Sequence, residues 1–187
     1  IRYNGGNIMV QSPDHNDDEE FTYVTQSLLE TECEKLDIEV IDIELHHVGV
    51  PHLIIELKEN VLLNKDLLEI LGNILSEYYI NNINNKGMNI NFINLNSDLD
   101  EHSINVVTWE RGVNRITESC GSGSLASYYY YLNDNTIHDH KDHVTINLLK
   151  NRKLIIQKDP LSYITYLVGK VVEYNQDVEH SVINQHQ

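Results

Sequence analysis

Short apolar runs recur along most of this 187-residue chain, and only two longer stretches show helical spacing. Two strands are predicted within residues 36–57, around a break at Gly49–Pro51, and further strands within residues 88–95, 104–109, 143–149, 153–157 and 163–174. One helix is predicted after Asn64, which caps it, and a second directly after Cys120. Many strands with two substantial helices indicate an α+β fold.

The charge balance excludes one class of partner. The chain has 29 acidic and 13 basic residues and a net charge of -16, which repels nucleic acid. No apolar run approaches the roughly 20 residues needed to cross a bilayer, and no secretory signal pattern opens the chain. We therefore expect a cytoplasmic protein with neither a nucleic-acid partner nor a membrane partner.

Cys120 is the candidate for chemistry, because it opens onto a glycine-serine turn that leads into the second predicted helix. The first N–H groups of a helix are unpaired and carry the positive end of its dipole, so they favour a thiolate and can hold a substrate carboxylate. The alternative is a small buried hydrophobe, the usual role of a free cysteine. Cys33 lies between glutamates without any glycine, and we predict that these neighbours raise the pKa of its thiol.

Four short motifs occur in order along the chain. They are GVPH at Gly49–His52, GMN at Gly87–Asn89, ERG at Glu110–Gly112 and CGSG at Cys120–Gly123. Together with the closing strand segments they resemble the second half of diaminopimelate epimerase and its cofactor-independent racemase relatives, over roughly residues 40–174.

This resemblance implies a strand-rich barrel wrapped around a central helix, with part of a pseudo-symmetric second domain. In such enzymes one cysteine removes the Cα proton of an amino acid and another, on the opposite face, returns a proton. No pyridoxal phosphate or metal is needed, so no cofactor is expected. The N–H groups of helix starts stabilise the charge that develops on the substrate carboxylate.

The resemblance also assigns roles to individual residues. It implies catalytic roles for Cys120, His52 and Glu110. It implies that Glu110 and Arg111 bind the amino group and the distal carboxylate of the substrate, and that Asn89 also contacts the distal carboxylate. The main chain of Gly121 and Ser122 would bind the carboxylate next to the reacting Cα. A guanidinium can hold a carboxylate through two parallel hydrogen bonds, which suits Arg111 to a second acid group.

Two departures from the family pattern leave alternatives open. The cysteine of the family's first domain, set in a CGNG-like turn, has no counterpart in this chain. A missing first domain or a second chain, as in a homodimer, would have to carry it; otherwise the chain is a noncatalytic substrate-binding half. Val50 stands where the family has asparagine, so a racemase of another amino acid, for example histidine, is an alternative to diaminopimelate epimerase.

The predicted organisation has three parts. Residues 1–36 are interpreted as a remnant of a first domain with a connector, residues 37–172 as the epimerase-like domain, and residues 173–187 as a tail returning toward the first domain. A rival metal site is offered by His138, His140 and His143, whose imidazoles at this density can bind zinc or nickel. The competing interpretation of that segment is an exposed linker. No metal is expected in the predicted catalytic site around Cys120.

Overall fold

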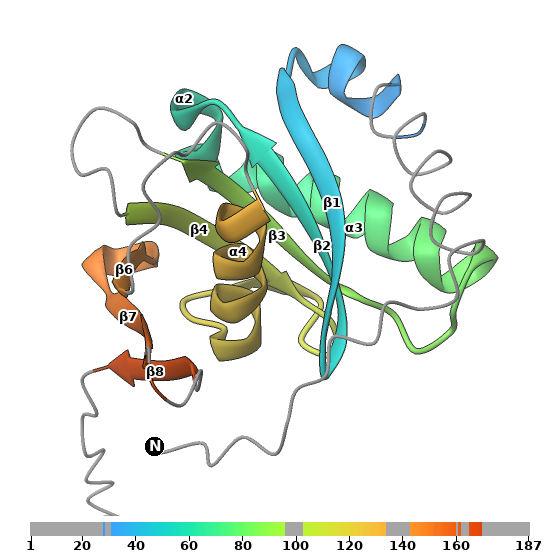
Figure 1. Ribbon diagram of the computed structural model, residues 1–187. Coiled ribbons are helices and arrows are strands. Elements are labelled where there is room, and N and C mark those ends of the chain that lie inside the picture. Colours follow the sequence, from blue (N-terminus) through green and yellow to red (C-terminus); the bar gives the residue numbers. More distant parts are fainter. Residues whose placement is uncertain are drawn as a thin grey trace, which may run out of the picture.

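The computed structural model describes residues 28, 31–95, 103–133, 143–159, 161 and 165–169 (Figure 1). Its strands are β1 (Val40–Val48), β2 (Val50–Leu57), β3 (Asn89–Leu95), β4 (Ser103–Glu110), β5 (Arg115–Thr117), β6 (His143–Asn147), β7 (Lys153–Lys158) and β8 (Thr165–Gly169). Its helices are α2 (Glu59–Leu62), α3 (Lys65–Asn82) and α4 (Gly121–Asn133), with a 3₁₀ turn at Leu149–Asn151. Residues 31–36 form a further short helical segment.

The eight strands form one mixed sheet in the order β1-β2-β3-β4-β6-β7-β8, and β5 pairs with β4. The β2/β3 and β4/β6 pairs are parallel, whereas β3 and β4 are antiparallel. Helix α3 connects the first parallel pair and α4 lies within the connection of the second. Parallel neighbours need such crossovers, and crossovers of this kind are nearly always right-handed. Because β4 runs opposite to β3, the same handedness places α3 and α4 on opposite faces of the sheet, as Figure 1 shows.

Each face of the sheet has its own core. One apolar cluster joins alternate residues of the central strands, such as Phe92 and Trp109, to Leu68, Leu71 and Leu75 of α3. The other cluster joins the intervening strand residues to the α4 face, where Ala126, Tyr128, Tyr130 and Tyr131 are buried. This division follows from the period of two along a strand.

Helix α3 confirms the prediction made from its cap. The side chain of Asn64 accepts the backbone N–H of Leu67 at 3.2 Å, and the helix runs from Lys65 to Asn82. Gly72 lets α3 lie directly on Trp109, because a Cβ at position 72 would stand 2.5 Å from Cδ1 of the indole. Trp109 Nε1 also donates to Asn73 at 3.3 Å, which fixes the helix along β4.

The barrel prediction is met in its coarser form. The fold is a mixed α/β arrangement of eight strands and few helices, and α4 contacts β1, β2, β3, β4 and β7, so the sheet curves around this helix. Among the described residues β1 and β8 end the sheet without pairing to each other, so the sheet is open and the expectation of a barrel needs that correction. Closure would require the two end strands to meet, whereas in the described part of the chain β1 pairs with β2 and β8 pairs with β7.

The predicted division into three parts remains a prediction. Residues 1–27 and 170–187 lie outside the described residues. Within the predicted first part, Leu28, Cys33 and Leu36 pack in or against the α3-side cluster. None of the helices in the described ranges is long and apolar enough to span a membrane.

Candidate active site

A polar layer lies under the first turn of α4, built from side chains that share one face of three central strands. His52 of β2 is opposite Asn89 of β3, and Asn91 of β3 is opposite Thr108 of β4. Side chains two residues apart point to the same face of a strand, so these four residues face α4 with the apolar residues of the second cluster. The turn between β1 and β2 and the first turn of α4 lie at the same, lower edge of the sheet in Figure 1.

His52 is fully buried within this layer. Its Nδ1 lies 3.0 Å from Nδ2 of Asn91 and its Nε2 lies 3.4 Å from Nδ2 of Asn89. Burial is the main cause that lowers the pKa of His52 to about 4, and the positive charges of His46, His47 and Arg111 act in the same direction. The imidazole is therefore neutral at pH 7.

Asn89 links His52 to the ERG motif. Its Oδ1 accepts the backbone N–H of Arg111 at 3.0 Å, so the turn after β4 is attached to the start of β3. The guanidinium Nη1 of Arg111 donates to the carbonyl oxygens of Lys86 and Gly87, at 3.2 and 3.4 Å. Asn89 is buried, and both ends of its amide face protein groups.

Cys120 caps helix α4 with its sulfur. The backbone N–H of Gly123 donates to Cys120 Sγ at 3.4 Å, and the carbonyl of Cys120 accepts the first helical bond, from Ser124 N at 2.9 Å. This is the position where serine or aspartate usually accepts the same N–H group. The hydroxyl of Ser122 also lies 3.5 Å from the sulfur. Cys120 is 6% exposed and belongs to neither apolar cluster.

Gly123 connects the helix start to the polar layer. A Cβ at position 123 would overlap Oδ1 of Asn91 and stand 3.0 Å from Oγ1 of Thr108. The Thr108 hydroxyl donates to that same Oδ1 at 3.0 Å, and Asn91 in turn contacts His52. The absence of a side chain at Gly123 thus lets the capping turn that carries the sulfur lie directly on Asn91, which contacts the imidazole.

The remaining predicted residues lie around this turn. Gly121 and Ser122 are the first two residues of α4, where backbone N–H groups have no acceptor within the helix. Leu167 of β8 packs beside Gly121. Glu110 ends β4 on the face shared with Thr108, is half-buried, and pairs across the hairpin with Arg115. Of the seven predicted residues, His52 and Asn89 belong to the polar layer, and the other five lie at the end of β4, in the turn after it and at the start of α4.

Cys33 lies on the other side of the sheet. It is buried in the α3-side cluster, and burial followed by the charge of Glu32 raises its pKa to about 11. The predicted direction of this shift is confirmed, although burial rather than a glutamate is its larger cause. Cys33 therefore cannot serve as an opposing thiol to Cys120 within this fold.

A second polar group occupies the same face farther along the strands. The hydroxyl of Tyr130 donates to Glu56 at 2.7 Å and lies 3.0 Å from Oδ2 of Asp42. Burial and these two carboxylates raise the pKa of Tyr130 well above its ordinary value, so the phenol remains protonated. This hydrogen bonding attaches the C-terminal half of α4 to β1 and β2.

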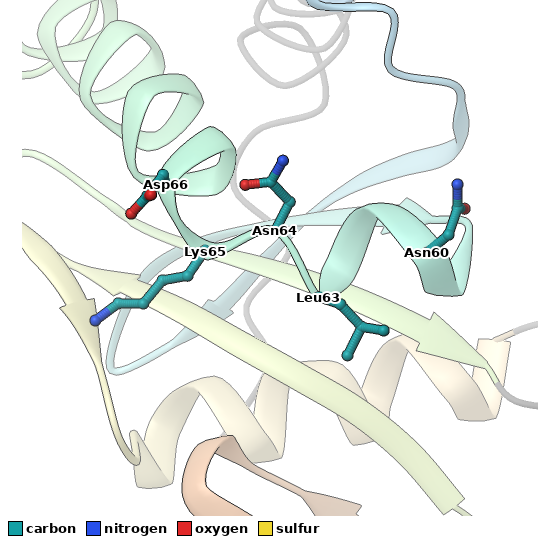
Figure 2. A pocket seen from close by; sticks show the side chains of 5 residues that line it. All are labelled: Asn60, Leu63, Asn64, Lys65 and Asp66. Carbon is teal, nitrogen blue, oxygen red and sulfur yellow. The ribbon is translucent and has the colours of Figure 1, made fainter.

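A pocket lies away from this layer, at the junction of α2 and α3. Figure 2 shows its lining residues, Asn60, Leu63, Asn64, Lys65 and Asp66. Asn64 is already used as the cap of α3, and Leu63 is 81% exposed. The residues predicted for catalysis do not line this pocket.

The rival metal site falls largely outside the described residues, which include only His143 of its three histidines. His143 is exposed at the start of β6. Within the ranges that the structure describes, no group of three or more histidine, cysteine or acidic side chains could hold a metal ion.

Asn91 and Thr108 were missed at the level of sequence. The signal was the alternation in residues 89–94, NINFIN, which places Asn89 and Asn91 on one face of β3. Thr108 likewise shares a face with the predicted Glu110, two residues along β4. An interior strand with polar residues on alternate positions indicates a buried polar layer, because buried amides require hydrogen-bond partners.

No family model matches the sequence, and no curated protein matches it. Among solved structures, the chain is similar to the Bacillus anthracis phenazine biosynthesis protein of the PhzF family, at 16% identity and a TM-score of 0.41. The match covers 70% of this chain and 37% of that chain. The chain thus spans little more than one third of the length of the structure it matches.

Proposed function

We propose that this chain carries one catalytic half of a cofactor-independent amino-acid epimerase or racemase, with diaminopimelate as its substrate. The observation that carries the proposal is the contact series that joins the four sequence motifs. His52 contacts Asn89, which holds Arg111, and His52 also contacts Asn91, which packs on the capping turn of Cys120. Residues that are remote in sequence are thereby connected, through Asn91 and Gly123, to the helix start that carries the sulfur.

The proposed chemistry begins with the sulfur of Cys120 as a thiolate. It takes the hydrogen of the substrate Cα as a proton, so an S–H bond forms as the Cα–H bond breaks. The electron pair left on Cα spreads into the adjacent carboxylate. The N–H groups of Gly121 and Ser122, at the positive end of α4, would stabilise this charge because they are fixed in place before the reaction.

Specificity is assigned to the turn after β4. Glu110 would bind the substrate amino group, and Arg111 the distal carboxylate of diaminopimelate. Arg111 uses Nη1 on the carbonyls of residues 86 and 87. A guanidinium has five N–H donors in all, so the fork can serve the loop and a carboxylate together. Val50, which stands where the family has asparagine, is the first residue of β2 and lies two residues before His52. Because of this difference, a racemase of another amino acid such as histidine is the alternative substrate assignment.

The position of Cys33 favours a second candidate, a substrate-binding half without turnover. The chain has two cysteines, and Cys33 lies in the core on the opposite face of the sheet. Inversion requires a second acid on the far side of Cα, which a first domain or a second chain would supply. Cys120 alone can return a proton only to the face from which it took one, so the chain by itself would exchange hydrogen with retention of configuration.

The test follows hydrogen exchange at Cα rather than inversion. The protein is incubated with diaminopimelate in deuterated water, and the substrate mass and chirality are measured. We expect one deuterium to enter at Cα, and Arg111→Gln to reduce exchange of diaminopimelate more than exchange of amino acids without a distal carboxylate. Binding by calorimetry without exchange would support the noncatalytic half, and exchange that ignores the distal carboxylate would remove diaminopimelate as substrate.

A further inference from the structure

The buried imidazole of His52 faces an amide nitrogen at each of its ring nitrogens. Nδ2 of Asn91 lies 3.0 Å from Nδ1, and Nδ2 of Asn89 lies 3.4 Å from Nε2. A neutral imidazole has one N–H donor and one acceptor nitrogen, whereas an amide nitrogen only donates. One of the two amides must therefore set which ring nitrogen carries the hydrogen.

The orientation of Asn89 is fixed by a group that can only donate. The backbone N–H of Arg111 donates at 3.0 Å, so the atom of Asn89 that receives it is the oxygen. The amide nitrogen of Asn89 consequently faces His52 Nε2. At 3.4 Å this contact is long. The amide nitrogen has no lone pair that could accept a hydrogen from Nε2.

The orientation of Asn91 is fixed from both sides. Its Nδ2 lies 3.5 Å from the carbonyl oxygen of Leu53, which can only accept, and its Oδ1 receives the hydroxyl of Thr108 at 3.0 Å. Gly123 packs over the same Oδ1, so α4 holds the amide against β2. At 3.0 Å the Asn91 amide is therefore the hydrogen-bond donor to Nδ1.

We propose that Asn91 is a positioning residue that holds His52 as the neutral tautomer with its hydrogen on Nε2. This inference deepens the proposed function and rests on it, because it gives His52 a specific task in the same site. In this tautomer the ring hydrogen lies on Nε2, on the side of the ring that faces Asn89, where it would be the donor to an acceptor oxygen of an anionic substrate. His52 acts as a hydrogen-bond donor to that oxygen, and the proton-removing base remains Cys120.

The experiment reads the tautomer directly by nitrogen NMR of histidine-labelled protein at neutral pH without substrate. The signals of His52 are identified as those missing from His52→Gln. We expect the wild-type protein to carry the hydrogen on Nε2. In Asn91→Asp the carboxylate accepts from Nδ1, so the hydrogen should move to Nδ1 and the pKa of the ring should rise.

The matched control is Asn94→Asp, on the same strand. Asn94 is also buried, but it faces the other side of the sheet and donates to the carbonyl of Leu57 at 2.8 Å. This variant should leave the His52 tautomer unchanged. A merely structural role for Asn91 would give the same spectrum in both variants.

A wild-type hydrogen on Nδ1, or an unchanged tautomer in Asn91→Asp, would overturn the inference. If Asn91→Asp does not fold, the wild-type spectrum alone decides it. The two proposals fail separately, since this measurement needs no turnover. Hydrogen exchange at Cα with the hydrogen on Nδ1 refutes the role of Asn91 alone, whereas the expected tautomer without any exchange refutes the proposed function alone.

Discussion

Gly123 of α4 lies directly on the carboxamide of Asn91 in β3, so closely that a Cβ at position 123 would overlap Asn91 Oδ1. The same residue donates its backbone N–H to the sulfur of Cys120. Through this one glycine, the sulfur and the amide that contacts His52 belong to a single packed unit. The relative position of the sulfur and the imidazole is therefore set by the central strands and not by a surface loop.

Gly123→Ala should destabilise the protein and displace the start of α4. The added methyl group meets the amide of Asn91 and the hydroxyl of Thr108, both of which are buried, and overpacking of this kind costs about 1–3 kcal/mol. Urea unfolding measures the change. Gly121→Ala is the control, because its methyl would meet the movable end of Leu167 at 3.2 Å. An equal decrease in the free energy of unfolding in the two variants would contradict the close packing of Gly123 on Asn91.

The stability of the protein should depend on pH through His52. Its pKa is about 4 in the folded protein against an ordinary value of 6.5, so between these values the unfolded chain binds the proton that the folded chain excludes. The contribution of His52 to the free energy of unfolding is thus fully present above pH 6.5. It is lost as the pH is lowered to 4, and the loss is about 3 kcal/mol.

The measurement compares urea unfolding of the wild-type protein and His52→Gln at several pH values from 7 downward. Acidic groups titrate in both proteins, so the difference between the two curves isolates the imidazole. The wild-type protein should lose its stability relative to the variant as the pH falls. Parallel curves would show that His52 takes up a proton in the folded protein as readily as in the unfolded chain.

Tyr130→Phe should destabilise the contact between α4 and the first two strands. The variant loses the 2.7 Å hydrogen bond from the phenol to the buried Glu56, and a hydrogen bond to a charged group contributes about 1.5–3 kcal/mol. Tyr129→Phe, on the neighbouring half-buried tyrosine, is the control and should change the unfolding free energy much less. A similar small change in both would mean that the phenol of Tyr130 contributes no net stability.

Much of the fold could be predicted from local sequence signals. The cap at Asn64 and the apolar spacing after it determine α3, and the glycine-serine turn after Cys120 determines the start of α4. Most of the strands could also be predicted from short apolar or alternating runs. Such runs match the observed burial of the strands, which is continuous or alternating according to their position in the sheet. These signals are local, so one sequence suffices to see them.

The arrangement of the site depends on contacts that local signals do not contain. The side chain of Asn91 has meaning only once β2 and β4 are placed on either side of β3, which brings His52 and Thr108 to it. Gly123 likewise shows its purpose only when α4 lies on that strand. The short strand β5 and helix α2 were also missed, because elements of three or four residues have no period to detect.

The role of Cys120 as the proton-removing base is decided by deuterium entry at the substrate Cα in Cys120→Ala beside Cys33→Ala. We expect exchange to fall to the background rate without the sulfur of Cys120 and to continue in Cys33→Ala, with circular dichroism showing that both variants are folded. Exchange at the wild-type rate in Cys120→Ala would refute this role, because the proton would then be removed by another group.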